Sequence, residues 1–282
     1  MKTTNISKKK YNELEFLELD NSVIGTEGKI YKLDHLRKQK LFKNLYNTSG
    51  SYFANKLYTL EMLDNYKELF PSSFVVPTEL ISVAGKVTGF SVPYIKGITL
   101  KTVLNNTKIS NEEKLLYLKK IGVVLDKMKD IRKHTDLKDF YIGDLHENNF
   151  LIDPITKKIF VIDVDSIKIA DNSAFPAKYL TKYSLYSKEN KNNFITNEKS
   201  DLYCYNTCIL NFLYKDFTHN FTIEEYYEYL NYLESLKINK ELMKSFDTAF
   251  QQGVNINPYQ YLESLTDTQI GRASSKVFKL VR

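Results

Sequence analysis

The spacing of apolar residues changes once along this 282-residue chain, and that change constrains the fold more than any other feature. Residues 14–100 contain short runs in which polar and apolar side chains alternate, as in half-buried β-strands. After Gly97, apolar residues recur every three or four positions, which is typical of amphipathic helices. We therefore predict an α+β fold with a small β-rich N-terminal part and a larger helical C-terminal part.

The same patterns give the expected elements and their boundaries. The expected strands are 15–19, 29–33, 79–83 and 87–93, and the first part also holds a helix at 51–69. Further helices are expected at 111–133, 199–215, 223–236, 239–251 and 258–266. The chain then divides into residues 1–95, residues 96–270 and a basic tail, 271–282, with the hinge near 93–97.

Composition limits the cellular setting more than the function. The formal net charge of +6 is mild, so it decides little, and we expect no nucleic-acid partner. The only two cysteines, Cys204 and Cys208, stand one helical turn apart, a poor disulfide geometry, and are expected to be reduced core residues. Without an apolar N-terminal segment or a run of 18 apolar residues, we expect a soluble cytoplasmic protein with no membrane partner.

Four polar residues are expected to meet at one end of a short hairpin. Asp144 lies in a loop before a strand that opens at Asn149, and a second strand ends in the acids Asp163 and Asp165. These side chains offer only hard oxygen ligands, which suit Mg²⁺ bound together with substrate phosphates. Buried strands that end in unpaired carboxylates are hard to explain structurally, so we predict a phosphoryl-transfer site.

The segments "GDLHENN" and "IDVDS" resemble the catalytic loop and metal motif of the protein-kinase-like fold, in the form found in bacterial eukaryotic-like Ser/Thr kinases. The resemblance covers roughly residues 15–266 and implies a two-lobed fold. It implies that Asp144 orients the acceptor hydroxyl and that Asn149 and Asp163 hold the metal. Asp165, which stands where most eukaryotic kinases have Gly, is expected at the metal site as one of the hard oxygen ligands.

Other segments match the family in order. "VIGTEGKIYKL" resembles the glycine-rich phosphate loop through Gly25, Gly28 and Ile30, although Val23 replaces the usual first glycine. "GFSVPYIKGITL" resembles the last strand of the first lobe and the hinge. The resemblance implies that the adenine pocket is lined by the backbone groups of Pro93, Tyr94 and Ile95.

The family's phosphate-pairing lysine and its glutamate partner are assigned less directly. We choose Lys40 because Leu41 and Phe42 follow it as in a buried strand, with Lys43 as the alternative. Glu61, on the expected helix at 51–69, would be the partner of this lysine.

The later part of the chain carries both matches and departures. Residues 175–189 resemble an activation segment, and Asp201 in "EKSDLYCYN" is expected to brace the catalytic loop by hydrogen bonds. Ile142 and Gly143 replace the His and Arg of the family's H-R-D motif, so activation by phosphorylation through that Arg is not expected. His146 is expected to be exposed or to make a structural hydrogen bond.

The function these features imply is ATP- and Mg²⁺-dependent phosphoryl transfer to Ser/Thr hydroxyls of protein substrates by a monomer or weak dimer. Two alternatives stay open. One is a small-molecule phosphotransferase of the aminoglycoside or choline kinase type, which shares the two acidic motifs. The other is a nucleotide-binding pseudokinase scaffold, favoured by the missing first glycine and the missing histidine.

Overall fold

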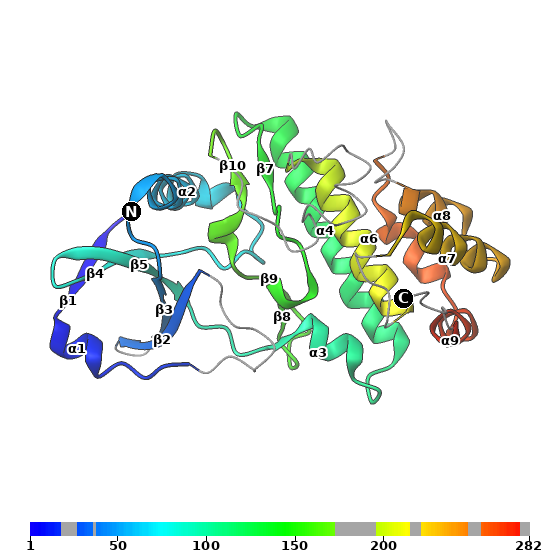
Figure 1. Cartoon of the computed structure of the whole chain (residues 1–282), viewed down its shortest axis with the longest axis horizontal. Coiled ribbons are helices and arrows are strands. Elements are labelled where there is room, and N and C mark those ends of the chain that lie inside the picture. The colour runs from blue at the N-terminus through cyan, green and yellow to red at the C-terminus, as the bar shows by residue number, and fades with distance from the viewer. Residues whose placement is uncertain (18–26, 36–37, 173–195, 215–220, 248–254, 277–282) are drawn as a thin grey trace.

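The computed structural model describes residues 1–17, 27–35, 38–172, 196–214, 221–247 and 255–276. It has the mixed α+β composition that the sequence predicts, with a β-sheet at one end of the molecule and most helices at the other (Figure 1). Among the described residues, no helix is both long and apolar enough to cross a membrane.

The main sheet has five strands in the order β1-β4-β5-β3-β2. Strands β2 (Gly28–His35) and β3 (Lys38–Leu45) form an antiparallel pair, and β3 is also antiparallel to β5 (Lys86–Pro93). Strand β4 (Glu79–Val83) pairs with β5 through the turn at Gly85, whose φ of 86° suits glycine. The strands expected at 29–33, 79–83 and 87–93 are therefore confirmed.

The N-terminus adds elements that the sequence analysis did not predict. Strand β1 (Thr3–Ile6) is parallel to β4 at the edge of the sheet, and α1 (Lys8–Asn12) follows it. The strand expected at 15–19 is reduced, within the described residues, to an isolated bridge between Phe16 and Tyr31. One reason is the exposure of Phe16, which leaves this segment little apolar burial to hold it as a strand.

Helix α2 (Gly50–Tyr66) packs beside the sheet and continues as a short 3₁₀ helix, Lys67–Leu69, so the helix expected at 51–69 is confirmed (Figure 1). The segment after this 3₁₀ helix is hydrogen-bonded to β9 (Ile159–Val161) in the helical part. The Val75 N–H donates to the Val161 carbonyl, and the Val161 N–H donates to the Ser73 carbonyl. Phe70 also stacks on Phe140, with ring centroids 4.9 Å apart.

Two small sheets lie between the main sheet and the long helices (Figure 1). One has the order β6-β8-β9, with β6 at Ile98–Thr99 and β8 at Phe150–Ile152. The other pairs β7 (Phe140–Tyr141) with β10 (Lys168–Ile169). Together they carry the loops that hold the polar residues of the candidate site.

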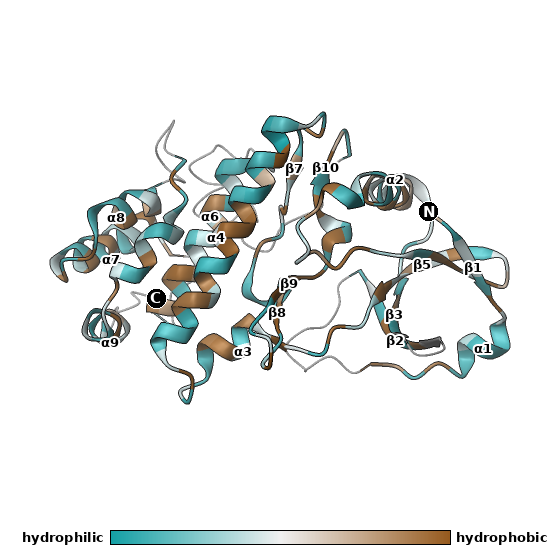
Figure 2. Ribbon diagram, turned by 180° about the vertical axis from the view of Figure 1, so that it is seen from behind, coloured by the Kyte–Doolittle hydropathy of each residue, from teal (hydrophilic) through white to brown (hydrophobic). Residues whose placement is uncertain are grey.

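The helical part is built around α4 (Asn111–His134) and α6 (Glu198–Leu213), which follow α3 (Leu100–Asn105). Figure 2 shows hydrophobic stretches on α4 and α6. Their buried residues include Leu118, Ile121 and Ile209, at the helical spacing that the sequence showed. The remaining elements are α7 (Ile223–Ser235), α8 (Lys240–Phe246), a 3₁₀ helix (Pro258–Ser264) and α9 (Asp267–Ser275).

Two elements differ from the sequence expectation near the C-terminus. The segment expected to be a helix at 258–266 is a 3₁₀ helix that opens with Pro258. Helix α9 begins with a capping box between Thr266 and Gln269 and runs across position 271, where the basic tail was expected to start. Its buried Ile270 and Ala273 join the main core, so residues up to Ser275 belong to the folded part.

Candidate active site

The loop 142–149 presents Asp144 beside Asn149, as the sequence predicts. Gly143 turns the chain after β7 with a φ of 72°, a conformation that a side chain would disfavour. The Asn149 side-chain amide donates to the Asp144 carbonyl at 2.8 Å and approaches its Oδ2 at 3.4 Å. Because that amide N–H₂ fixes the orientation of the side chain, the Asn149 Oδ1 atom is the one left for a cation.

Asp201 on α6 braces this loop. Its two carboxylate oxygens accept from the backbone N–H groups of Ile142 and Gly143, each at 2.8 Å, which confirms the expected hydrogen bonds. Burial raises the pKa of Asp201 to about 6, although both N–H groups oppose the shift. The loop is thus fastened to the helical core by a carboxylate that has little access to water.

The neighbours of Asp144 in this loop have structural roles. His146 Nδ1 accepts from the Asn148 N–H at 3.2 Å, and its Nε2 lies 3.5 Å from Asp144 Oδ2. Glu147 is buried and accepts from the Asn211 amide on α6. The structural hydrogen bond expected for His146 is therefore present.

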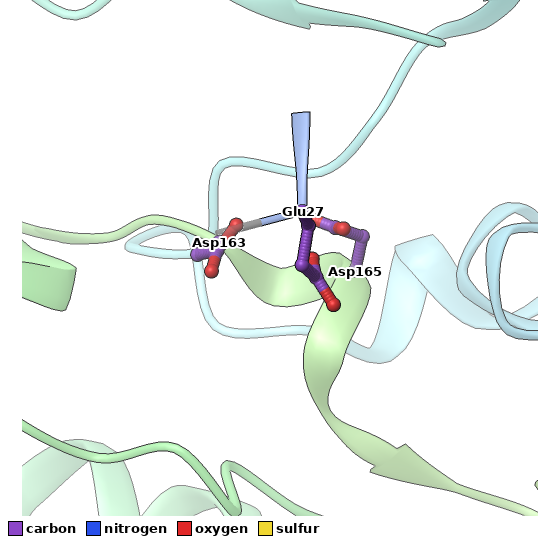
Figure 3. A group of neighbouring side chains, drawn as sticks. All are labelled: Glu27, Asp163 and Asp165. Atoms are coloured by element: carbon purple, nitrogen blue, oxygen red, sulfur yellow. The ribbon is translucent and has the colours of Figure 1, made fainter. Parts of the chain in front are cut away.

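Five charged side chains meet where the main sheet faces the loop after β9, and we call them the ion cluster: Lys43, Lys56, Glu27, Asp163 and Asp165. Figure 3 shows the three carboxylates side by side, with Glu27 directly before β2 and the two aspartates from the turn after β9. Asp163 precedes a 3₁₀ turn and adopts a left-handed φ of 59°, which is uncommon outside glycine and concentrates at functional sites.

Lys43 lies at the centre of the ion cluster. Its Nζ donates to Asp163 Oδ1 at 2.5 Å, to Asp165 Oδ2 at 2.9 Å and to Glu27 Oε2 at 2.9 Å. Burial opposes the charge, but the three carboxylates outweigh it and hold the pKa of Lys43 well above its ordinary value. The lysine is therefore charged, and all three of its N–H donors have an acceptor.

Lys56 on α2 is the second cation of the cluster, and its side chain is fully buried. Its Nζ donates to Asp165 Oδ2 and to the Asp165 carbonyl, each at 2.9 Å, and contacts both oxygens of Glu27 at 3.1 and 3.2 Å. Helix α2 is thereby tied to the turn after β9 and to Glu27, directly before β2.

The two aspartates of "IDVDS" have different surroundings. Asp165 is almost fully buried, and although burial raises its pKa, Lys43 and Lys56 outweigh that effect and lower it below its usual range. Asp163 keeps a side-chain exposure of 33%; burial, opposed by Lys43, raises its pKa to about 6. Asp163 is therefore the carboxylate of the cluster that faces solvent most.

The preference for Lys40 as the phosphate-pairing lysine is corrected. Lys40 donates to Glu79 at 2.5 Å, whereas Lys43, the alternative, contacts Asp163. Positions 40 and 43 differ by an odd number, so their side chains leave opposite faces of strand β3. Apolar neighbours such as Leu41 and Phe42 cannot distinguish the two faces.

Glu61, expected to pair with that lysine, is also corrected, because it is exposed and lies outside the ion cluster. The buried positions of α2 are Lys56, Thr59, Leu60 and Leu63. Glu61 comes directly after Leu60, and one step along a helix turns the side chain away from the buried face. The residue that α2 sends into the cluster is a cation instead.

Two residues of the expected nucleotide-binding segments, Gly28 and Pro93, lie at the ends of strands. Gly25 lies outside the described residues, and Ile30 is half-buried in β2. Gly28 is buried where β2 meets β3, and a Cβ there would collide with the Asn44 carbonyl, so strand packing alone requires this glycine. Pro93 ends β5, Tyr94 donates its N–H to the Gln39 carbonyl, and Ile95 is half-buried.

The expected activation segment, residues 175–189, lies outside the described residues. Cys204 and Cys208 are both buried and are not joined by a disulfide, which confirms the expectation that they are core residues.

Magnesium fits part of the predicted ligand set. The carboxylate oxygens of Glu27, Asp163 and Asp165 lie within 4.8 Å of one another, but both lysines already bond to Asp165. An oxygen shared by two ammonium groups is poorly suited to a third cation. Asp163, which pairs with Lys43 alone among the described residues, therefore fits a Mg²⁺ ion better than Asp165 does.

The sequence analysis did not identify Lys56, Glu27 or Tyr52 as site residues. Tyr52 Oη donates to Glu27 Oε1 at 2.7 Å, so two residues of α2 hold this carboxylate. One signal could have indicated Lys56, because it occupies an apolar position of the helix, four residues before Leu60 and seven before Leu63. A lysine in such a stripe is rarely buried without a partner.

No protein-family model matches this chain, and a search of curated protein sequences finds no significant similarity.

Proposed function

We propose that this protein is an ATP- and Mg²⁺-dependent phosphotransferase with a protein-kinase-like, two-lobed fold. One observation carries the proposal: Lys43 from the middle of the sheet forms an ion pair with Asp163, which lies 120 positions later in the chain. Asp163 follows β9, which pairs with β8, and Asn149 directly precedes β8. A buried lysine, a partly exposed carboxylate and an oriented Asp–Asn loop are the parts that phosphoryl transfer requires.

Each residue has a role that its contacts support. Lys43 is charged and held in place, so it can pair with phosphate oxygens. Asp163 and the Asn149 oxygen would hold Mg²⁺, which neutralises the phosphates when bound. Asp144 Oδ2, fixed beside Asn149, would accept the hydrogen bond of the acceptor hydroxyl and align it with the phosphate.

For the acceptor, we propose Ser or Thr hydroxyls of protein substrates, following the likeness of "SDLYCYN" and of the sequence between Ser166 and Glu189 to protein kinases. The small-molecule alternative depends on residues 173–195, which lie outside the described part of the chain. The adenine would approach the end of β5, where Pro93 has no N–H and that of Tyr94 already bonds to Gln39. Ile95 is therefore the backbone donor we assign to the adenine.

One observation favours the pseudokinase alternative. The cluster has two lysines against three carboxylates, so every cation is compensated without a nucleotide. Such a network could serve only to join α2 to the rest of the molecule. Activity therefore requires that phosphates replace one of the carboxylates at Lys43.

Incubation of the purified protein with γ-labelled ATP, Mg²⁺ and a generic protein substrate tests the proposal. Asp163→Asn, which keeps the shape but removes the charge, and Asp144→Asn are the matched variants. We expect label in the substrate with the wild type, little with either variant, and none without Mg²⁺. Nucleotide binding without transfer would favour the pseudokinase, and the same label from all three proteins would refute the assignment of these residues.

A further inference from the structure

The lysine of a phosphoryl-transfer site needs a partner that stays in place, because its four-carbon stem is flexible. Lys43 has three carboxylate partners and three N–H donors, so no donor is left for a phosphate. One carboxylate must therefore give way when a nucleotide binds, and the other two must remain to orient the lysine.

Contacts of the three carboxylates indicate which one gives way. Asp165 is fixed by Lys56 and is 3% exposed. Glu27 is 19% exposed and is held by Lys56 and by the Tyr52 hydroxyl. Asp163 is the most exposed of the three, and Lys43 is the one side chain with which its carboxylate forms an ion pair among the described residues. Asp163 is thus the partner best able to exchange Lys43 for a bound cation.

Helix α2 cannot supply the fixed carboxylate itself. Of its two acids, Glu61 is exposed and Asp64 pairs with Lys67, whereas the charged side chain that α2 sends into the ion cluster is the cation Lys56. Lys56 has carboxylate oxygens of both Glu27 and Asp165 within 3.2 Å. The carboxylate is instead supplied by Glu27, directly before β2, and the helix supplies the positive charge that holds it.

We propose that Glu27, held by Lys56 and Tyr52, is a positioning residue that orients Lys43 for phosphoryl transfer in place of a helix glutamate. This inference rests on the proposed function. It makes the position of Lys43 depend on the contacts of Glu27 with α2. Glu27 touches the lysine and acts through it.

Kinetics of Glu27→Gln and of the control Glu61→Gln test the inference, with label transfer measured over a range of ATP concentrations. For Glu27→Gln we expect a loss of kcat on the order of tenfold with little change in KM, because the lysine still binds phosphate but is less well aligned. Glu27→Asp should recover part of the loss. Glu61→Gln should match the wild type in both constants.

Three outcomes would overturn the inference. With an active wild type, unchanged kcat in Glu27→Gln removes the positioning role, and an equal loss in Glu61→Gln returns that role to the helix. If Glu27→Gln fails to fold, as judged by thermal unfolding, Tyr52→Phe decides, because it removes one hydroxyl without changing the charge. We expect a several-fold loss of kcat there, and an unchanged kcat refutes the role. An inactive wild type instead refutes the proposed function itself.

Discussion

Strand β3 places one lysine on each face of the main sheet, and the surroundings of the two lysines differ. On one face, Lys40 pairs with the single carboxylate Glu79, beside a small apolar cluster formed by Ile6, Leu33, Phe42 and Ile81. On the other face, Lys43 lies among three carboxylates and opposite the fully buried Phe90.

The difference follows from which part of the molecule covers each face. The face with Lys40 is covered by N-terminal residues such as Tyr11 and Leu14, whose side chains carry no charge. The face with Lys43 meets α2 and the turn after β9, which bring Lys56, Asp163 and Asp165. A lysine on strand β3 therefore becomes a candidate site residue through the face it occupies, because both lysines have one apolar and one polar neighbour along the chain.

The largest effect is expected when the two lysines are exchanged for methionine one at a time. Lys43→Met should lower kcat for label transfer on the order of 10²- to 10³-fold, because it removes a fixed cation from the phosphates. Lys40→Met, on the opposite face, should stay within about twofold of the wild type. Parallel assays at saturating ATP measure both. Equal losses in the two variants would show that the faces do not differ in function.

A second large effect is expected on stability, at Lys56. Lys56→Met leaves Glu27 and Asp165 with Lys43 as their one remaining cation in the cluster, and breaking a buried pair of this kind should lower the free energy of unfolding by about 3 kcal/mol. Chemical denaturation measures the loss. The control is Lys67→Met, because Lys67 follows α2 directly and is half exposed in its pair with Asp64.

The comparison with Lys67 identifies what the burial contributes. We expect Lys67→Met to change the free energy of unfolding by less than about 0.5 kcal/mol. Adding Glu27→Gln to Lys56→Met should restore part of the stability, because one uncompensated carboxylate is removed. A Lys56→Met variant as stable as the control would mean that water or rearrangement replaces the lysine at no cost.

Much of the fold could be predicted from the sequence because it depends on local periodicity. The alternating runs before Gly97 gave β2, β4 and β5 to within about two residues, and apolar spacing gave α2, α4, α6 and α7. Strand β1 was missed because a four-residue edge strand carries little periodic signal and depends on β4 for its hydrogen bonds.

The candidate site was predictable only where its residues are close in sequence. Asp144, Asn149 and Asp163 lie within one stretch of chain whose turn chemistry is readable. The lysine and its partners come together from β2, β3 and α2, so their identity depends on strand parity and on which helix face is buried. Those are tertiary facts, and they explain why Lys40 and Glu61 were chosen and Lys43, Lys56 and Glu27 were the residues found.

Asp201 is a buried carboxylate outside the ion cluster. It has two backbone N–H donors and no direct ion pair among the described residues, so it shows what burial without a lysine does to the pKa of a carboxylate. Burial raises its pKa from 3.8 to about 6, so the folded state binds the proton more tightly than the unfolded state. The stabilisation is complete below pH 3.8 and is lost as the pH rises through 6.

This sign gives a measurable slope. Between pH 5 and 7, the free energy of unfolding should fall by roughly 1 kcal/mol through this group. Asp201→Asn does not titrate, so the slope of its stability against pH should lack this part. Denaturant unfolding of both proteins at pH 5, 6 and 7 measures it. Parallel curves would show that the carboxylate keeps an ordinary pKa and that its two N–H donors compensate for burial.

The smallest effect is expected at the pair of Lys40 and Glu79, which completes the comparison of the two faces. Each side chain is about one-fifth exposed, and Glu79 also accepts from the Thr4 hydroxyl at 2.8 Å. Those hydrogen bonds, partly opposed by burial, lower the pKa of Glu79, so the pair stabilises the fold above the ordinary pKa of glutamate and less as the pH falls below it.

Lys40→Gln should therefore lower the free energy of unfolding at pH 7 by about 0.5 kcal/mol, and by less at high salt, because water and ions screen a pair at this depth. Denaturation at low and high salt measures both values, with Thr4→Val as the control that leaves the ion pair in place. A loss near that of Lys56→Met would mean that one partly exposed carboxylate holds a lysine as strongly as the buried cluster does. The distinction between the faces would then lie in chemistry alone and not in stability.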